Sequence, residues 1–180
     1  MKRLVLLLSC ILATAHLHAL AGEITPPKQA STVLFICEHG SSRSFVAATL
    51  FNRIAEQRGL SDRALSRAVS AQTVDKRVPP RLVASMAAEG VEADSFQPRP
   101  VTTSEADHAA RIVIIGYDDK IDAVGNAPAD HWNDIPAASL EYGNAKRKIT
   151  SHIEELLRNL PATGEAEAGA TQRSGNPAGR

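Results

Sequence analysis

Apolar residues follow two different spacings along this chain. Residues 33–36 and 112–115 are short unbroken apolar runs, and residues 64–71 form a third stretch typical of a strand. In residues 45–58 the apolar positions instead recur every three or four residues, which is the spacing of a helix with one buried face. The pattern therefore predicts strands that alternate with helices.

Three further helices are predicted from the signals at their ends. Residues 79–89 begin with two prolines, which the first turn of a helix tolerates, and they stop before a glycine. Thr102 and Glu105 form a capping box for a short helix that ends before Arg111. Residues 139–160 form the closing helix, which a proline follows. Its apolar stripe consists of Ile149, Ile153, Leu156 and Leu160.

Strands that alternate with helices, without a hairpin signal, predict an α/β fold with a parallel sheet covered on both faces. Residues 112–115 agree with this, because four consecutive β-formers without alternation indicate a strand buried on both faces. With 180 residues, 43% of them apolar, the chain is expected to hold one compact domain of roughly 130 residues. We place this domain at residues 32–160, after a linker at 22–31. Residues 161–180 are predicted to be a disordered tail, because they lack large apolar residues that could pack.

The first 21 residues have the organisation of a secretory signal peptide. Lys2 and Arg3 precede an apolar run, and residues 19–21 offer a small-x-small cleavage site. We therefore expect an exported protein, periplasmic or secreted, that makes no membrane contact after cleavage. Lipidation at Cys10, an uncleaved anchor and retention in the cytoplasm are the alternatives.

Composition argues against several classes of function. The chain has 20 Lys and Arg residues against 20 Asp and Glu residues, so no basic surface for a nucleic acid is expected. No His or Cys cluster has the spacing of metal ligands, and neither a metal nor an organic cofactor is expected. Cleavage of the leader would remove Cys10 and leave Cys37 as the only thiol, so we expect no intramolecular disulfide.

The most informative stretch begins where residues 33–36 end. Cys37 follows this run, a loop of mostly small and polar residues leads to Arg43, and the helix at 45–58 comes next. Such a loop gathers unpaired backbone N–H groups at the positive end of the helix dipole, which makes a site for anions. The same field favours the thiolate of Cys37, which is the nucleophilic form, and the planar fork of Arg43 can bind two oxygens of an oxyanion. The alternative, an inert buried cysteine and an ordinary exposed arginine, leaves the small residues between them unexplained.

The pattern of Cys37, five further residues, Arg43 and Ser44 between a strand and a helix resembles the phosphate-binding loop of the cysteine-dependent protein tyrosine phosphatases. Because the loop stands near the start of the mature chain, it is similar to the low-molecular-weight branch, whose superfamily also contains the thioredoxin-coupled arsenate reductases. Residues 70–73, Ser-Ala-Gln-Thr, resemble the Ser-Ala-Gly-Thr segment of that family. The resemblance covers residues 32–160 and implies a flavodoxin-like three-layer sandwich with a four-stranded parallel sheet in the order 2-1-3-4.

The resemblance also implies roles for the loop residues. Cys37 would be the nucleophile, Arg43 would stabilise the oxyanion, and Ser44 would donate a hydrogen bond to the thiolate. The family's loop usually contains an asparagine that helps to hold its backbone, and a second cysteine, and both are missing here. Glu38 adds a negative charge near the anion site, and His39 pairs with it or faces solvent. The loop residues expected to bind the substrate are Glu38, His39, Gly40, Ser41, Ser42 and Ser44.

A second loop is expected to supply the acid. In the family, the last strand ends in an Asp-Pro loop whose Asp protonates the leaving oxygen, and Asp134 is the residue that matches it. The match is incomplete, because Ile135 separates Asp134 from Pro136, and two alanines follow where members that take phosphotyrosine have aromatic rings. Asp130 is the alternative acid, and a plain turn position is the alternative role of Asp134.

Three functions agree with these residues. The first is a phosphatase that acts on a phosphate ester or a phosphoprotein through a cysteinyl-phosphate intermediate. The second is arsenate reduction, which would need an external small thiol as reductant because the chain lacks the two further cysteines of the thioredoxin-coupled enzymes. The third is an oxyanion-binding domain with little or no turnover.

Overall fold

The structure, a computed structural model, describes residues 30–159. The predicted signal peptide, most of the linker and the C-terminal tail lie outside the described residues, so export and the nature of both ends stay predictions. Within the described part, no helix is both long and apolar enough to cross a membrane.

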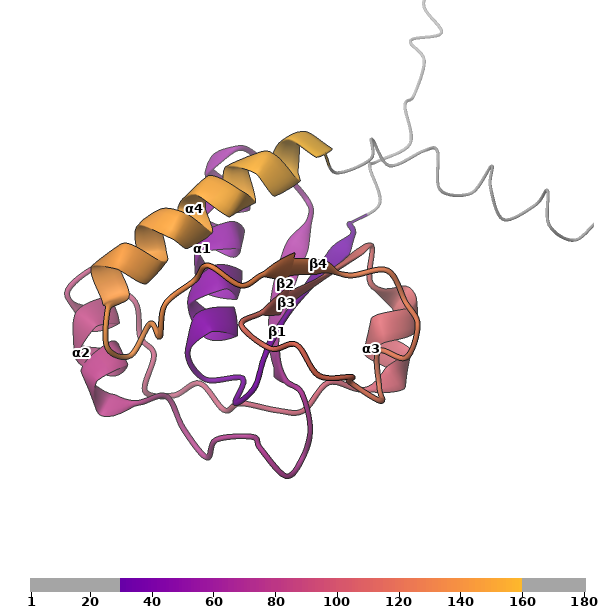
Figure 1. The fold of residues 1–180 in the computed structure, drawn as a ribbon. Coiled ribbons are helices and arrows are strands. Elements are labelled where there is room, and N and C mark those ends of the chain that lie inside the picture. Colours follow the sequence, from indigo (N-terminus) through magenta and orange to yellow (C-terminus); the bar gives the residue numbers. More distant parts are fainter. Residues whose placement is uncertain (1–29, 160–180) are drawn as a thin grey trace, which may run out of the picture.

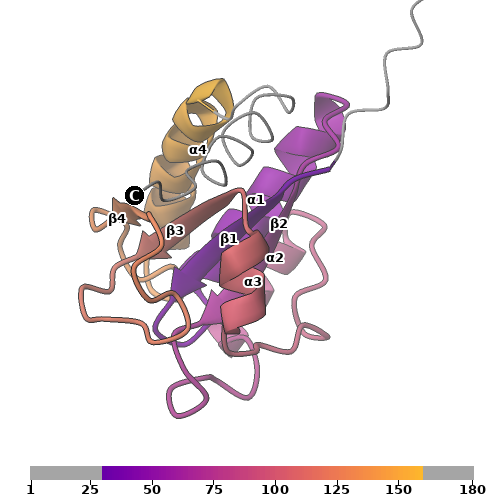
Figure 2. The same ribbon diagram turned by 90° about the vertical axis from the view of Figure 1, so that its right-hand side faces the viewer.

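Four parallel strands form the sheet (Figure 1), and Figure 2 shows their order, β2-β1-β3-β4. β1 therefore lies inside the sheet between β2 and β3, whereas β2 and β4 are its edges. This arrangement confirms the predicted α/β class and the flavodoxin-like order 2-1-3-4. The strands are β1 (Thr32–Cys37), β2 (Arg63–Ala68), β3 (Arg111–Ile115) and β4 (Asp130–Trp132).

Helices cover both faces of the sheet, which gives three layers. α1 and α4 pack against each other on one face, and α2 contributes to the same apolar core (Figure 1). α3 lies on the opposite face (Figure 2). The helices are α1 (Arg43–Gln57), α2 (Pro80–Ala87), α3 (Thr103–His108) and α4 (Tyr142–Asn159).

The residues of β1 point alternately into the two cores. Val33 and Phe35 belong to the core under α1 and α4, while Leu34 and Ile36 belong to the core on the α3 side. All four side chains are 0% exposed. β1 is thus an apolar strand buried on both faces, and it holds Cys37 at a fixed place at its carboxyl end.

Among the element ends that differ from the sequence prediction, two shift by three residues. β2 ends earlier, at Ala68, because the next amide, that of Val69, turns toward the carbonyl of Glu38 in the Cys37 loop (3.4 Å). α4 begins later, at Tyr142, because a turn closed on the carbonyl of Ala137 comes before it. The first of these differences already shows that the chain after β2 supports the Cys37 loop.

A buried arginine joins the sheet to α3. Arg67 of β2 is 5% exposed, and its Nε lies 3.0 Å from both carboxylate oxygens of Glu105. The capping box predicted from Thr102 and Glu105 is present and fixes the same carboxylate at the start of α3. The hydrogen bond from Arg67 is the main cause that lowers the pKa of Glu105.

Glu105→Gln is expected to reduce the free energy of unfolding by about 2 kcal/mol at pH 7, because the buried guanidinium loses its counter-charge. The pKa of Glu105 is lowered in the folded state, so this stabilisation is present above the ordinary value of 4.5 and is lost as the pH falls through the lowered value. Urea unfolding at pH 7 and at pH 3 measures the effect, with the exposed Glu92→Gln as control. A deficit that is equally large at both pH values would contradict the ion-pair explanation.

Candidate active site

Cys37 ends β1 at the carboxyl edge of the sheet, between the neighbouring strands β2 and β3. Its side chain is 3% exposed, and its Sγ lies 3.0 Å from Oγ of Ser44 in the first turn of α1. Oγ of Ser66, from β2, lies 2.8 Å from the Ser44 hydroxyl. Ser44 is therefore placed to donate a hydrogen bond to a thiolate at Cys37, which stabilises the charged form.

The loop after Cys37 folds tightly against β2. Gly40 is buried and has a φ of 70°, in the left-handed region that favours glycine. A Cβ at this position would lie 2.6 Å from the backbone nitrogen of Ala68. Both the backbone angle and the available space therefore require glycine here. The next residue, Ser41, is 0% exposed, so its side chain supports the loop from inside.

α1 begins directly after this loop without a side-chain cap. Its N-cap residue, Ser42, makes no side-chain hydrogen bond to the helix, and Oγ of Ser42 is buried without a partner among residues 30–159. The first amides of α1 are therefore not occupied by a cap, and the helix dipole adds positive potential at the same end. This end of α1 favours an anion beside Cys37.

Arg43 reaches across the carboxyl edge of the sheet. Its Nε lies 3.4 Å from the carbonyl of Pro136, in the loop after β4. A Cβ at Gly116, just after β3, would lie 3.0 Å from Nη1 of Arg43, so the guanidinium packs against this glycine. Within the described residues, its other N–H donors have no partner, and a guanidinium carries five in all. Arg43 is thus held by its Nε and free to bind an oxyanion with its terminal nitrogens.

Glu38 and His39 form the exposed rim of the loop. Their side chains are 49% and 50% exposed, and Nε2 of His39 lies 3.7 Å from Oε2 of Glu38. Nδ1 of His39 lies 2.8 Å from the carbonyl of Thr73, and because a carbonyl only accepts, Nδ1 must carry a proton. His39 therefore lies beside Glu38 with its side chain half exposed, and it also ties the loop to the segment after β2.

Sequence reasoning missed the chemistry of that segment. Thr73 Oγ1 donates to the carbonyl of Glu38 (2.8 Å), and the Ser41 hydroxyl donates to the carboxylate of Asp75. Residues 70–73 entered the prediction only through their resemblance, and Asp75 did not enter it at all. A signal was available, because the carboxyl ends of neighbouring parallel strands meet at one edge of a sheet, so polar residues after β2 must lie near Cys37.

Asp134 is turned toward α4. Its carboxylate oxygens lie 2.9 Å from Nζ of Lys148 and 2.8 Å from Nε2 of His152, whose ring stacks on Trp132. The hydrogen bond from Lys148, followed by that from His152, lowers the pKa of Asp134. Pro136 is the residue of this loop that contacts Arg43. Within residues 30–159, no contact of Asp134 with the Cys37 loop supports its acid role, which stays a prediction.

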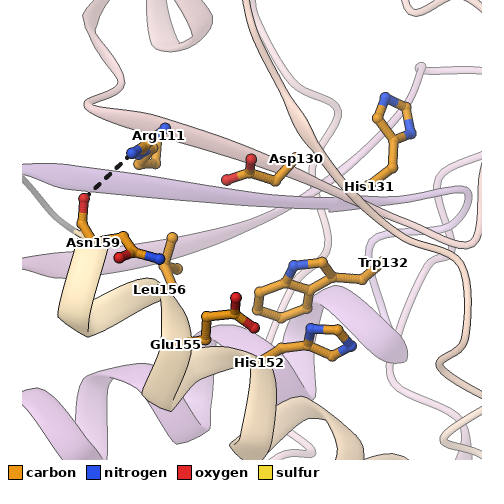
Figure 3. A pocket seen from close by; sticks show the side chains of 8 residues that line it. All are labelled: Arg111, Asp130, His131, Trp132, His152, Glu155, Leu156 and Asn159. Carbon is orange, nitrogen blue, oxygen red and sulfur yellow. Dashed lines mark hydrogen bonds between the residues drawn. The ribbon is translucent and has the colours of Figure 1, made fainter.

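Asp130 lines a different cavity, between β4 and the end of α4 (Figure 3). It pairs with Val113 of β3, whose partner on the other side is Phe35 of β1, so Asp130 lies two strands from β1. At the usual strand spacing this separation is about 10 Å. The structure therefore does not bring Asp130 to Cys37. Lining residues of this cavity include Arg111, His131, Trp132, His152, Glu155, Leu156 and Asn159.

The described residues form no cluster of metal ligands at this site. Among residues 30–159, no group of three His, Cys, Asp or Glu side chains is placed to bind a metal ion.

Solved structures share this fold. The chain matches YfkJ from Bacillus subtilis with a TM-score of 0.61 at 16% identity, over 83% of this chain and 100% of that one. A protein tyrosine phosphatase from Entamoeba histolytica matches with a TM-score of 0.62 at 16% identity, over 73% and 96%. A thioredoxin-dependent arsenate reductase from Corynebacterium glutamicum matches with a TM-score of 0.58 at 20% identity, over 75% and 64%. At these identities the likeness establishes the fold alone.

Sequence comparison identifies the family. No curated protein matches the chain by sequence. The family model described as low molecular weight phosphotyrosine protein phosphatase, however, matches residues 32–155, which include the eight helices and strands of residues 30–159 up to the last turn of α4. This match confirms the resemblance drawn from the Cys37 loop. The chain therefore belongs to the low molecular weight phosphotyrosine protein phosphatase family.

Proposed function

We propose that the chain is a cysteine-dependent phosphatase that hydrolyses phosphate monoesters, phosphotyrosine in proteins among them, through a cysteinyl-phosphate intermediate. The observation that carries this proposal is a buried thiol, Cys37, placed between the hydroxyl of Ser44, the uncapped start of α1 and the unpaired donors of Arg43. Membership of the family supports the reaction class.

The reaction would proceed in two displacements at phosphorus. The thiolate of Cys37 attacks phosphorus, the bond to the ester oxygen breaks, and the leaving oxygen takes a proton from an acid or from water. Arg43 and the loop amides bind the three non-bridging oxygens, where charge is concentrated in the transition state. A water molecule then attacks phosphorus and gives up a proton to solvent. The P–S bond breaks, inorganic phosphate leaves and the thiolate is restored.

Partitioning of the intermediate tests the proposal. The full chain is offered several aryl phosphates with different leaving groups, in water that contains an added alcohol as second acceptor. If all esters pass through one cysteinyl-phosphate, the ratio of alkyl phosphate to inorganic phosphate is the same for every ester. A ratio that changes with the ester contradicts the covalent route, and a chain that binds phosphate without any turnover is the oxyanion-binding domain instead.

Asp134→Asn is expected to slow an ester with a poor leaving group roughly 10²–10⁴-fold more than one with a good leaving group, because the predicted acid would leave Lys148 and His152 to protonate the leaving oxygen. The measurement is kcat/KM for one ester with a good leaving group and one with a poor leaving group. Asp130→Asn, in the other cavity, is the control. Equal, small losses on both esters would show that the carboxylate, which the structure binds to α4, has a structural role instead.

Arsenate reduction is the second candidate, since the fold is shared with arsenate reductases. Cys37 is the only free cysteine among the described residues, so an external thiol must attack its arsenate adduct. That attack would release arsenite and leave a mixed disulfide on Cys37, which a second thiol resolves. We expect any arsenite formation to require glutathione or a similar small thiol. Turnover with thioredoxin and its reductase as the sole reductant would contradict this.

A further inference from the structure

Three consecutive carbonyl groups of the Cys37 loop are each bound by a donor from residues 66–75. Thr73 Oγ1 donates to the carbonyl of Glu38 (2.8 Å). The amide of Asp75 donates to the carbonyl of His39 (3.2 Å). The hydroxyl of Ser66 donates to the carbonyl of Gly40 (2.9 Å). Every peptide unit from residue 38 to residue 41 therefore has its carbonyl group bound on the side that faces residues 66–75.

These hydrogen bonds also fix the direction of the N–H groups on the opposite side of the loop. The C=O and N–H of one trans peptide unit point in opposite directions, and the described chain has no cis peptide bond. The amides of His39, Gly40 and Ser41 must therefore point away from residues 66–75. Within residues 30–159 these three amides donate no hydrogen bond. Successive free amides around a left-handed residue, here Gly40, form a concave site for an anion.

Side chains tie the same two segments together a second time. Oγ of Ser41, buried in the loop, donates to the carboxylate of Asp75, and Nδ1 of His39 donates to the carbonyl of Thr73 (2.8 Å). Thr73 and Asp75 are thus each joined to the loop through both backbone and side-chain atoms. Together they make four hydrogen bonds to the loop.

We propose that Thr73 and Asp75 are positioning residues, which aim the amides of His39, Gly40 and Ser41 at the oxyanion beside Cys37. They would hold the loop backbone in place of the asparagine that the resemblance implies and that this chain lacks. The inference rests on the proposed function only in that the oxyanion is taken as the phosphoryl group of the substrate. Phosphate binding tests it without any turnover.

The experiment measures how tightly inorganic phosphate protects Cys37 from iodoacetamide in the full chain, read on the Cys37 peptide by mass spectrometry. Thr73→Val removes the hydroxyl and should raise the dissociation constant of phosphate about 3- to 10-fold, the usual weight of one hydrogen bond. Thr73→Ser keeps the hydroxyl and should stay near wild type. Asp75→Ala removes the partner of Ser41 and should act like Thr73→Val. The exposed Thr103→Val, on α3, is the matched control.

Several results would overturn the inference. The first is a dissociation constant of phosphate that is unchanged in both Thr73→Val and Asp75→Ala. The second is a Thr73→Ser variant that binds phosphate as weakly as Thr73→Val does. The third is a wild type in which phosphate does not protect Cys37 at all. Asp75→Ala decides the matter if Thr73→Val does not fold, which its thermal unfolding curve shows. A wild type that is protected but hydrolyses nothing refutes the proposed function and leaves this inference standing. Turnover together with unaffected variants refutes the inference alone.

Discussion

Cys37→Ser is expected to lower kcat for an aryl phosphate by roughly 10⁴- to 10⁶-fold, the loss that removal of a nucleophile causes in a concerted set of catalytic groups. Serine would place a hydroxyl where Sγ now lies 3.0 Å from Oγ of Ser44. A hydroxyl is not ionised near neutral pH, and the site offers an anion field but no base beside this atom among the described residues. The substitution therefore removes the attacking group while it keeps the shape of the loop.

Phosphate binding separates this chemical loss from damage to the site. Cys37→Ser should still bind inorganic phosphate with a dissociation constant close to that of wild type, because the loop amides and Arg43 are untouched; calorimetry measures it. Cys10→Ser, in the predicted leader, is the control for a cysteine outside the described residues and should keep full activity. Residual hydrolysis above about one per cent in Cys37→Ser would mean that another group is the nucleophile.

The fold could be predicted because its signals are local. The unbroken apolar runs of β1 and β3, the helical spacing of α1 and the capping box at Thr102 each lie within a few neighbouring residues. Apolar burial and backbone hydrogen bonding act at that range, so a single sequence shows them. The strand order has no such local signal, and only the resemblance carried by the Cys37 loop predicted it.

The candidate site was predictable only in its contiguous part. Cys37 and Arg43 lie close together in the sequence, at the end of β1 and the start of α1, and the reasons for their residue types are visible there. Asp75 and Asp134 depend on contacts between distant segments: Asp75 meets Ser41 only because β2 pairs with β1, and Asp134 meets α4 only once that helix has packed. Side-chain direction at such positions follows from tertiary packing, which spacing along the chain does not encode.

Arg43 combines two tasks that sequence alone suggests only in part. Its terminal nitrogens are free for an oxyanion, while its Nε lies 3.4 Å from the carbonyl of Pro136 and its guanidinium packs on Gly116. The contact with Pro136 orients the guanidinium of Arg43, because it holds this side chain against the loop after β4. A lysine would keep the charge but lose both the planar pair of donors and this tether.

Arg43→Lys is therefore expected to lower kcat/KM for an aryl phosphate by about 10²- to 10³-fold, the usual cost of a lost oxyanion donor. Most of the loss should appear in kcat, because the three non-bridging oxygens spread into a plane only in the transition state and the fork is matched to that geometry. Steady-state kinetics measures both parameters. Arg53→Lys, on α1 with its Nη2 bound to the carbonyl of Glu89 (3.4 Å), is the matched control. A variant that keeps more than about a tenth of wild-type kcat/KM would show that the charge suffices and that the fork and its tether to Pro136 serve structure alone.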